Sequence, residues 1–130
     1  MKTYWDSSAL VEALHAPGLR SRIRRGENGT RPHSLAEVFS TLTKGVNFRY
    51  PPADAANMAA DLAKDLDFVE LSAADAVSAL KKASSLGVRG ARIHDLMHAE
   101  AAIKYGADEL LTRDDAGFAS LNLPLQVAAP

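Results

Sequence analysis

The sequence predicts an α/β fold, a single domain in which a central parallel β-sheet is flanked by helices on both faces. Short apolar runs that fit buried strands alternate along the chain with longer segments of helical periodicity. Such an alternation is typical of a parallel sheet covered on both faces. The chain of 130 residues contains no internal repeat and no low-complexity linker. We therefore expect one compact domain over residues 1–130.

Helical periodicity is clear in the segment that begins at Ser34. Apolar side chains recur there at the spacing of one helix face: Leu35, Val38, Phe39 and Leu42. Ser34 is the expected N-cap, and Glu37 lies three residues on, at the position of a capping-box partner.

Three further segments favour helix. Residues 54–65 are rich in alanine. Residues 72–85 begin with Ser72 as a capping residue, and residues 93–104 are followed by Gly106, which is expected to terminate that helix.

The apolar runs between these helices predict four strands, at residues 3–5, 68–71, 109–112 and 125–128. The breaker-rich stretches 25–32 and 45–52 predict loops. In a parallel sheet the ligand site lies beyond the carboxyl ends of the strands, so residues that directly follow a strand are the first candidates for function.

Composition limits the classes of function. Fifteen basic and sixteen acidic side chains nearly cancel, so any nucleic-acid contact must depend on local positive charge. The absence of cysteine excludes disulfides, thiolate zinc sites and cysteine nucleophiles. No stretch is apolar enough for a membrane helix, and Asp6 interrupts any signal-peptide core, so we expect a cytoplasmic protein with no membrane contact.

Acidic residues occupy the strand ends and helix starts. Asp6 follows the first strand, Asp114 and Asp115 follow the third, Glu37 lies near an apolar helix stripe, and Asp95 lies in a first helical turn. Each acid alone also fits a helix cap or a partner of the helix dipole. For Asp6 that role could fall to Ser7 and Ser8 instead, which would leave Asp6 free to bind. Together the acids suit Mg²⁺ or Mn²⁺, because hard carboxylate oxygens bind these ions and a cation removes the repulsion among them.

Four short motifs carry a family resemblance. They are Asp6-Ser7-Ser8-Ala9-Leu10-Val11, Ser34-Leu35-Ala36-Glu37-Val38-Phe39, Ile93-His94-Asp95-Leu96 and Leu111-Thr112-Arg113-Asp114. In order and spacing they resemble the motifs of PIN-domain ribonucleases, in particular the VapC-type toxins of VapBC toxin–antitoxin pairs. The resemblance covers essentially the whole chain.

The resemblance implies that Asp6, Glu37, Asp95 and Asp114 are catalytic and bind Mg²⁺ or Mn²⁺. Thr112 matches a supporting hydroxyl in the family. Ser7 and Asp115 are expected as neighbouring support, although the Asp114-Asp115 doublet leaves the register of the fourth acid open. The implied activity is endonucleolytic hydrolysis of RNA, with tRNA or rRNA as substrate. The implied partners are a VapB-type antitoxin and a second copy of the chain.

A basic cluster is the candidate RNA contact. It comprises Arg20, Arg22, Arg24 and Arg25, with Arg31 nearby. These side chains could bind RNA phosphates, or they could form a solvated helix face. The apolar Val11, Leu14 and Leu19 and the loop residues 48–50 are candidates for partner contact, although core packing explains most of them more simply.

Three other functions compete with this prediction. His94, Asp95 and His98 imitate the spacing of a zinc protease, but the acid is shorter than glutamate and no third ligand follows. A magnesium-dependent phosphatase would share Asp6, but Ser8 stands where its second aspartate belongs. A catalytically silent PIN-like module that binds RNA or protein would have no need of four acids.

Overall fold

In the computed structural model, which describes residues 1–130, five strands form one sheet in the order β3-β2-β1-β4-β5. Every neighbouring pair of strands is parallel, which confirms the predicted fold class. The strands are β1 (Lys2–Trp5), β2 (Glu27–Thr30), β3 (Asp67–Phe68), β4 (Glu109–Leu111) and β5 (Gln126–Ala128). The helices are α1 (Ser7–His15), α2 (Pro17–Arg24), α3 (His33–Thr43), α4 (Pro52–Ala63), α5 (Ala73–Lys82), α6 (Ile93–Tyr105) and α7 (Asp115–Ala119), with a short 3₁₀ turn at Gly90–Arg92.

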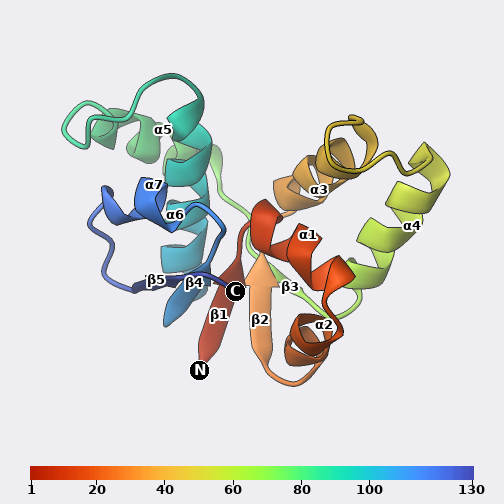
Figure 1. Cartoon of the computed structure of the whole chain (residues 1–130). Coiled ribbons are helices and arrows are strands. Elements are labelled where there is room, and N and C mark those ends of the chain that lie inside the picture. Colours follow the sequence, from red (N-terminus) through yellow and green to blue (C-terminus); the bar gives the residue numbers. More distant parts are fainter.

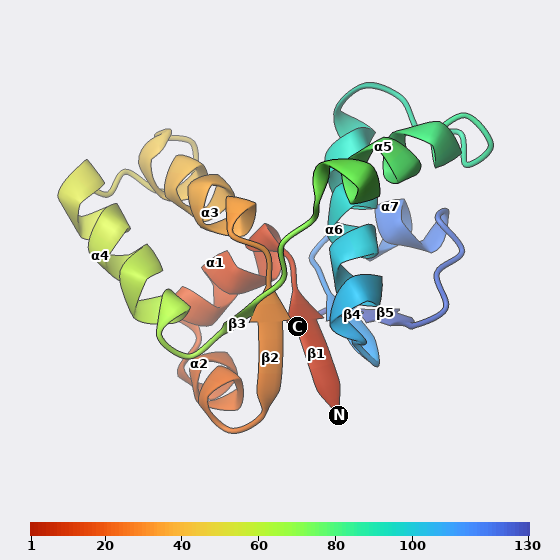
Figure 2. The same cartoon turned by 180° about the vertical axis from the view of Figure 1, so that it is seen from behind.

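Two groups of helices cover the two faces of the sheet, α1–α4 on one side and α5–α7 on the other (Figures 1 and 2). Successive side chains of a strand point to opposite faces, and β1 and β4 use both faces for apolar residues. Trp5 and Leu111 join the core beneath α1–α4, whereas Tyr4 and Leu110 join the core beneath α5–α7. This double burial explains why the central strands are continuous apolar runs. No helix is both long and apolar enough to span a membrane.

The prediction of a loop over residues 25–32 was wrong, because β2 lies there, next to the centre of the sheet. The strand is polar, and long-range bonds stabilise it. The Asn28 side chain accepts a hydrogen bond from Trp5 Nε1 at 2.8 Å and donates to the carbonyl oxygens of Arg22 and Ile23. At Gly29 the Tyr105 ring packs so closely that a Cβ would lie 2.7 Å from it. A strand of this kind has no apolar signal in the sequence.

The other predicted strands are present, but the strand predicted over residues 68–71 is shorter than expected. Only Asp67 and Phe68 form a strand there, at the edge of the sheet, and both are exposed. The other three observed strands overlap their predicted ranges to within one or two residues.

One predicted helix start was wrong. Helix α3 begins at His33 with Pro32 as N-cap and no side-chain cap. Ser34 is instead buried in the first turn, 2.7 Å from the Thr30 hydroxyl. Phe39, expected on the buried stripe, is 37% exposed. Glu37 is therefore free of the capping role and available for another contact.

The signals at α5 and α6 were read correctly. Ser72 caps α5 and forms a capping box with Asp75, although the helix ends at Lys82, before the predicted residue 85. Gly106 closes α6 with φ of 78°, a left-handed conformation that glycine adopts without strain.

The predicted partner surface is largely core. Val11 is 8% exposed, and Leu14, Leu19, Phe48 and Tyr50 are partly buried against the core beneath α1–α4. The His15 ring stacks on Phe48 at 4.6 Å between centroids. The simpler interpretation, core packing, holds for these side chains.

The capping box of α5 should make stability depend on pH. Lys104 Nζ donates to Asp75 at 2.7 Å and the backbone N–H of Ser72 donates at 2.9 Å, and these contacts lower the pKa of Asp75 to about 2. A lowered pKa means that the charged form stabilises the fold above the unfolded value of about 3.9 and stops doing so as pH falls through about 2. We expect Asp75→Asn to lower Tm at pH 7 by roughly 2–5 °C, and the difference to shrink between pH 4 and pH 2.

Thermal melts followed by circular dichroism at a series of pH values would measure this difference. Asp54→Asn is the matched control, because Asp54 also lies in the first turn of a helix but has no hydrogen bond or ion pair. A Tm difference for Asp75→Asn that stayed constant from pH 7 to pH 2 would contradict the assignment.

Candidate active site

Asp6 lies at the carboxyl end of β1 and caps α1. Its Oδ1 accepts hydrogen bonds from Ala9 N at 2.9 Å and from Ser8 Oγ at 2.6 Å, and the residue is 6% exposed. The expectation that Ser7 and Ser8 would take over the cap was therefore wrong, because the carboxylate itself does so. An ionised carboxylate has about four acceptor positions, so capping leaves Asp6 able to bind a further group.

Thr112 connects Asp6 to the end of β4. Its hydroxyl, which is completely buried, donates to Asp6 Oδ2 and accepts from the backbone N–H of Asp114 at 3.0 Å. Ser8 Oγ also accepts from the backbone N–H of Arg113 at 3.0 Å. These bonds fix the loop after β4 against the loop after β1.

Asp114 and Asp115 differ in what they contact. Asp114 is the N-cap of α7, with Oδ1 accepting from Gly117 N at 3.2 Å, and its charge acts on Asp95. Asp115 is exposed and makes no side-chain hydrogen bond or ion pair. The geometry favours Asp114 as the fourth acid.

Asp95, in the first turn of α6, is the carboxylate with the least support from its surroundings. It is half-buried and accepts no hydrogen bond from the protein. Burial, followed by the charges of Asp114 and Asp6, raises its pKa above the usual range, although the charges of His98 and Arg92 act in the opposite direction. Asp6 and Asp114, which follow β1 and β4, therefore lie close enough to Asp95 for their charges to oppose its ionisation.

Glu37 approaches from α3 and is held by a buried histidine. His98 Nε2 lies 2.9 Å from Glu37 Oε1, and His98 Nδ1 lies 2.8 Å from the Tyr4 hydroxyl. Burial opposes ionisation of Glu37, but the hydrogen bond and charge of His98, aided by Arg31 and His33, bring the pKa of its carboxyl below the usual range. Glu37 is thus kept as a carboxylate.

The donor set fits a hard divalent cation, although no three acidic or histidine side chains are already grouped to hold an ion. Asp95 has no protein partner and is repelled by two neighbouring acids. A cation would turn this repulsion into attraction, and oxygen ligands of this kind suit Mg²⁺ or Mn²⁺. Asp6, Asp95, Asp114 and Glu37 are the residues that would hold it.

The zinc-protease alternative was wrong. Zinc binding needs an unengaged imidazole nitrogen, and both ring nitrogens of His98 already bond to Tyr4 and Glu37. His94 instead faces His33, with 6.3 Å between ring centroids.

The arginine cluster does not join the acids. Arg20 is 9% exposed and forms ion pairs with Asp61 and Asp65. Arg22 pairs with Glu109, the first residue of β4, which is the opposite end of the sheet from Asp6. Arg24 lies 3.5 Å from Asp65, and Arg25 lines a hollow with Arg22 and Met1 at the amino ends of the strands. The RNA contact of this cluster stays a prediction, and Arg20 and Arg22 would have to leave these ion pairs to bind phosphate.

Sequence reasoning named His98 and Ser8 in other contexts but missed their contacts with Glu37 and with Arg113. His98 lies three residues after Asp95 and therefore on the same face of α6, which is a signal that the sequence did contain. Ser8 offered none, because its contact with Arg113 joins residues 105 apart in the chain. Ser7, expected as support, lines a shallow hollow together with Glu37 and His33.

Comparisons with known proteins agree with this fold. The family model described as the PIN domain matches residues 3–122, and the chain therefore belongs to the PIN-domain family. Two solved structures are similar to it. VapBC2 from Rickettsia felis, bound to a DNA fragment from its promoter, is 16% identical with a TM-score of 0.72, over 100% of both chains. PAE2754 from Pyrobaculum aerophilum is 17% identical with a TM-score of 0.73, over 98% of this chain and 89% of that one.

At these identities the structural likeness shows the fold alone. No curated protein matches the sequence.

The Thr112 hydroxyl should tune cation binding. Thr112→Val keeps the shape of the side chain but removes the donor to Asp6 and the acceptor of Asp114 N. Because neighbours that orient a ligand typically affect metal affinity 10–100-fold, we expect Mg²⁺ and Mn²⁺ affinity, measured by calorimetric titration, to fall by roughly that factor. Thr112→Ser retains the hydroxyl and should keep most of the affinity. Equal affinities for the two variants would show that the hydroxyl has no such role.

Proposed function

We propose that this protein is an endoribonuclease that depends on Mg²⁺ or Mn²⁺ and acts as the toxin of a VapBC-type toxin–antitoxin pair. The observation that carries the proposal is Asp95, a half-buried carboxylate in the first turn of α6 that accepts no hydrogen bond and whose ionisation the nearby charges of Asp114 and Asp6 oppose. An unpaired, repelled carboxylate is costly to retain without a ligand. Membership of the PIN-domain family supports nuclease chemistry.

The proposed roles differ among the residues of the site. Asp6, Asp95, Asp114 and Glu37 are the proposed metal ligands and catalytic acids, whereas Thr112, Ser7 and Asp115 lie beside them. A bound divalent cation lowers the pKa of water and stabilises negative charge on a phosphate. Thr112 and Ser8 hold Asp6 in one orientation. His98, oriented by Tyr4, keeps Glu37 ionised and directed to the site.

The toxin role rests on family resemblance and fold. The similar VapBC2 structure is that of a toxin–antitoxin complex bound to DNA, which supports a VapB-type antitoxin as partner here. By the same resemblance we propose tRNA or rRNA as substrate, a homodimer as the assembly, and the cytoplasm as the place of action. The competing function is a catalytically silent PIN-like module that binds RNA or protein.

RNA cleavage by the purified protein tests the proposal. Total RNA, tRNA and rRNA would be incubated with the wild type in Mg²⁺, in Mn²⁺ and in EDTA, and the products resolved on denaturing gels. We expect discrete internal cuts with either cation and none in EDTA. Asp6→Asn, which preserves the helix cap, should be inactive and so exclude a contaminating nuclease. A folded wild type that cut none of these RNAs would favour the silent binding module.

A further inference from the structure

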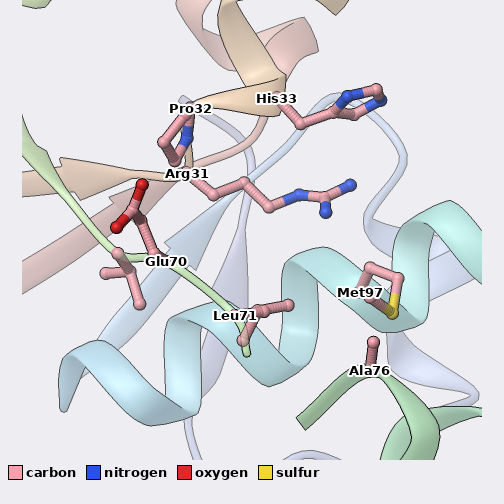
Figure 3. Close-up of a pocket in the computed structure, with 8 residues that line it drawn as sticks. Arg31, Pro32, His33, Glu70, Leu71, Ala76 and Met97 are labelled. Carbon is pink, nitrogen blue, oxygen red and sulfur yellow. The ribbon is translucent and has the colours of Figure 1, made fainter. Parts of the chain in front are cut away.

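A cavity of about 250 Å³ lies between the end of β2, the segment after β3, and helices α5 and α6. Arg31 and His33 extend into it from the junction of β2 and α3, whereas Leu71, Ala76 and Met97 form an apolar surface opposite them (Figure 3). The cavity therefore combines cationic or aromatic groups on one side with an apolar bed on the other.

The Arg31 side chain makes no hydrogen bond within the protein, although its charge acts on Glu37. Its Nε is buried without a hydrogen-bond partner, and its guanidinium makes no ion pair, although Glu70 lines the same cavity. Buried polar groups are nearly always bonded, so an unpartnered guanidinium beside an open cavity indicates a group that a ligand satisfies. The fixed geometry of guanidinium suits phosphate oxygens.

The cavity adjoins the acids. His33 lines both this cavity and the hollow that contains Ser7 and Glu37. The charges of Arg31 and His33 also act on Glu37. An RNA strand that extends from the acids past His33 would therefore reach the cavity directly.

We propose that this cavity holds one unpaired nucleobase of the RNA, next to the phosphate at the acids. The base packs on Leu71, Ala76 and Met97, and Arg31 donates to the phosphate of the same nucleotide. The inference rests on the proposed function for its ligand class. Its size favours a single base, because pockets for drug-sized molecules are roughly 300–1,000 Å³. Arginine and apolar or aromatic surfaces are the usual partners of bases in single-stranded RNA.

Glu70 gives the cavity a preference among bases. A carboxylate accepts from an exocyclic amino group and repels a carbonyl oxygen. Cytosine carries an amino group where uracil carries an oxygen, so these two pyrimidines form a matched pair. The cavity should favour cytosine.

Binding of fluorescein-labelled octamers of cytidylate and uridylate, followed by fluorescence anisotropy in Mg²⁺, tests the proposal. All proteins would carry Asp95→Asn, so that binding is measured without cleavage. Arg31→Ala removes the guanidinium, and Ala76→Phe fills the cavity. Val77→Phe is the matched control, because Val77 lies on the same helix outside the cavity and is 48% exposed. Circular dichroism melts would verify that each variant is folded.

We expect Arg31→Ala and Ala76→Phe to weaken cytidylate binding about 5- to 100-fold, the range for loss of one stacked base, and Val77→Phe to leave it unchanged. The protein that carries only Asp95→Asn should bind the cytidylate octamer several-fold more tightly than the uridylate octamer, and the additional substitution Glu70→Gln should remove that preference. Equal affinity of the Ala76→Phe and Val77→Phe proteins for the cytidylate octamer would overturn the inference. That result is expected if the cavity binds a protein segment rather than RNA.

The two failures are distinguishable. If the wild type cuts RNA while the proteins that combine Asp95→Asn with a cavity substitution bind the octamers as tightly as Asp95→Asn alone, the inference falls and the nuclease stands. If the wild type cuts no RNA but the octamers still bind through the cavity, the proposed function falls and the base-binding site stands.

Discussion

Replacement of Asp95 by asparagine should abolish RNA cleavage and at the same time make the metal-free protein more stable. Asp95 has no hydrogen bond to offset its burial, and Asp114 and Asp6 repel its charge. Loss of a metal ligand should reduce cleavage by about 100-fold or more. Removal of the repelled charge should raise Tm in EDTA by roughly 1–3 °C at pH 7.

Addition of Mg²⁺ separates this behaviour from a general effect on folding. A ligand that binds only the native state raises Tm, so Mg²⁺ should stabilise the wild type and have little effect on Asp95→Asn. Asp54→Asn is the matched control, since Asp54 is an exposed acid in the first turn of α4 without a hydrogen bond or ion pair, and it should cut RNA and respond to Mg²⁺ like the wild type. Loss of activity in Asp115→Asn would move the fourth acid from Asp114 to Asp115.

Truncation of Trp5 should cost most of the stability of the fold. Trp5 is fully buried in the core beneath α1–α4, and its Nε1 donates to Asn28 at 2.8 Å. Trp5→Ala should lower the free energy of unfolding by about 3–5 kcal/mol, out of a typical total of about 5–15 kcal/mol. Trp5→Phe retains much of the apolar volume but leaves the Asn28 oxygen without its donor, at a cost of about 1–3 kcal/mol.

Urea denaturation followed by circular dichroism measures these losses. Phe68→Ala is the aromatic control, because Phe68 is 38% exposed at the edge of the sheet, and its effect should be much smaller. If Trp5→Ala destabilised the protein no more than Phe68→Ala, the bond between β1 and β2 would not be the central support that the structure indicates.

The sequence by itself determined the fold class, the boundaries of the helices that have strong local signals, and the four acidic residues that are candidates for the site. Each depends on neighbours in the chain. The period of apolar residues separates strand from helix, a serine three residues before an acid begins α5, and Gly106 ends α6. Because parallel strands place their carboxyl ends at one edge, the acids after β1 and β4 could be expected to meet.

Only the tertiary structure decided which polar groups are free to act. β2 is a strand because Trp5 and Tyr105 contact it from elsewhere in the chain, not because its own residues favour one. Asp6 and Thr112 meet across 106 positions, and Arg20 forms ion pairs because Asp61 in α4 and Asp65 just after it lie beside its guanidinium. A hydrogen bond or ion pair between distant residues leaves no periodic trace in the sequence. The unpaired state of Asp95 and Arg31, which carries both proposals, could therefore be seen only in the folded chain.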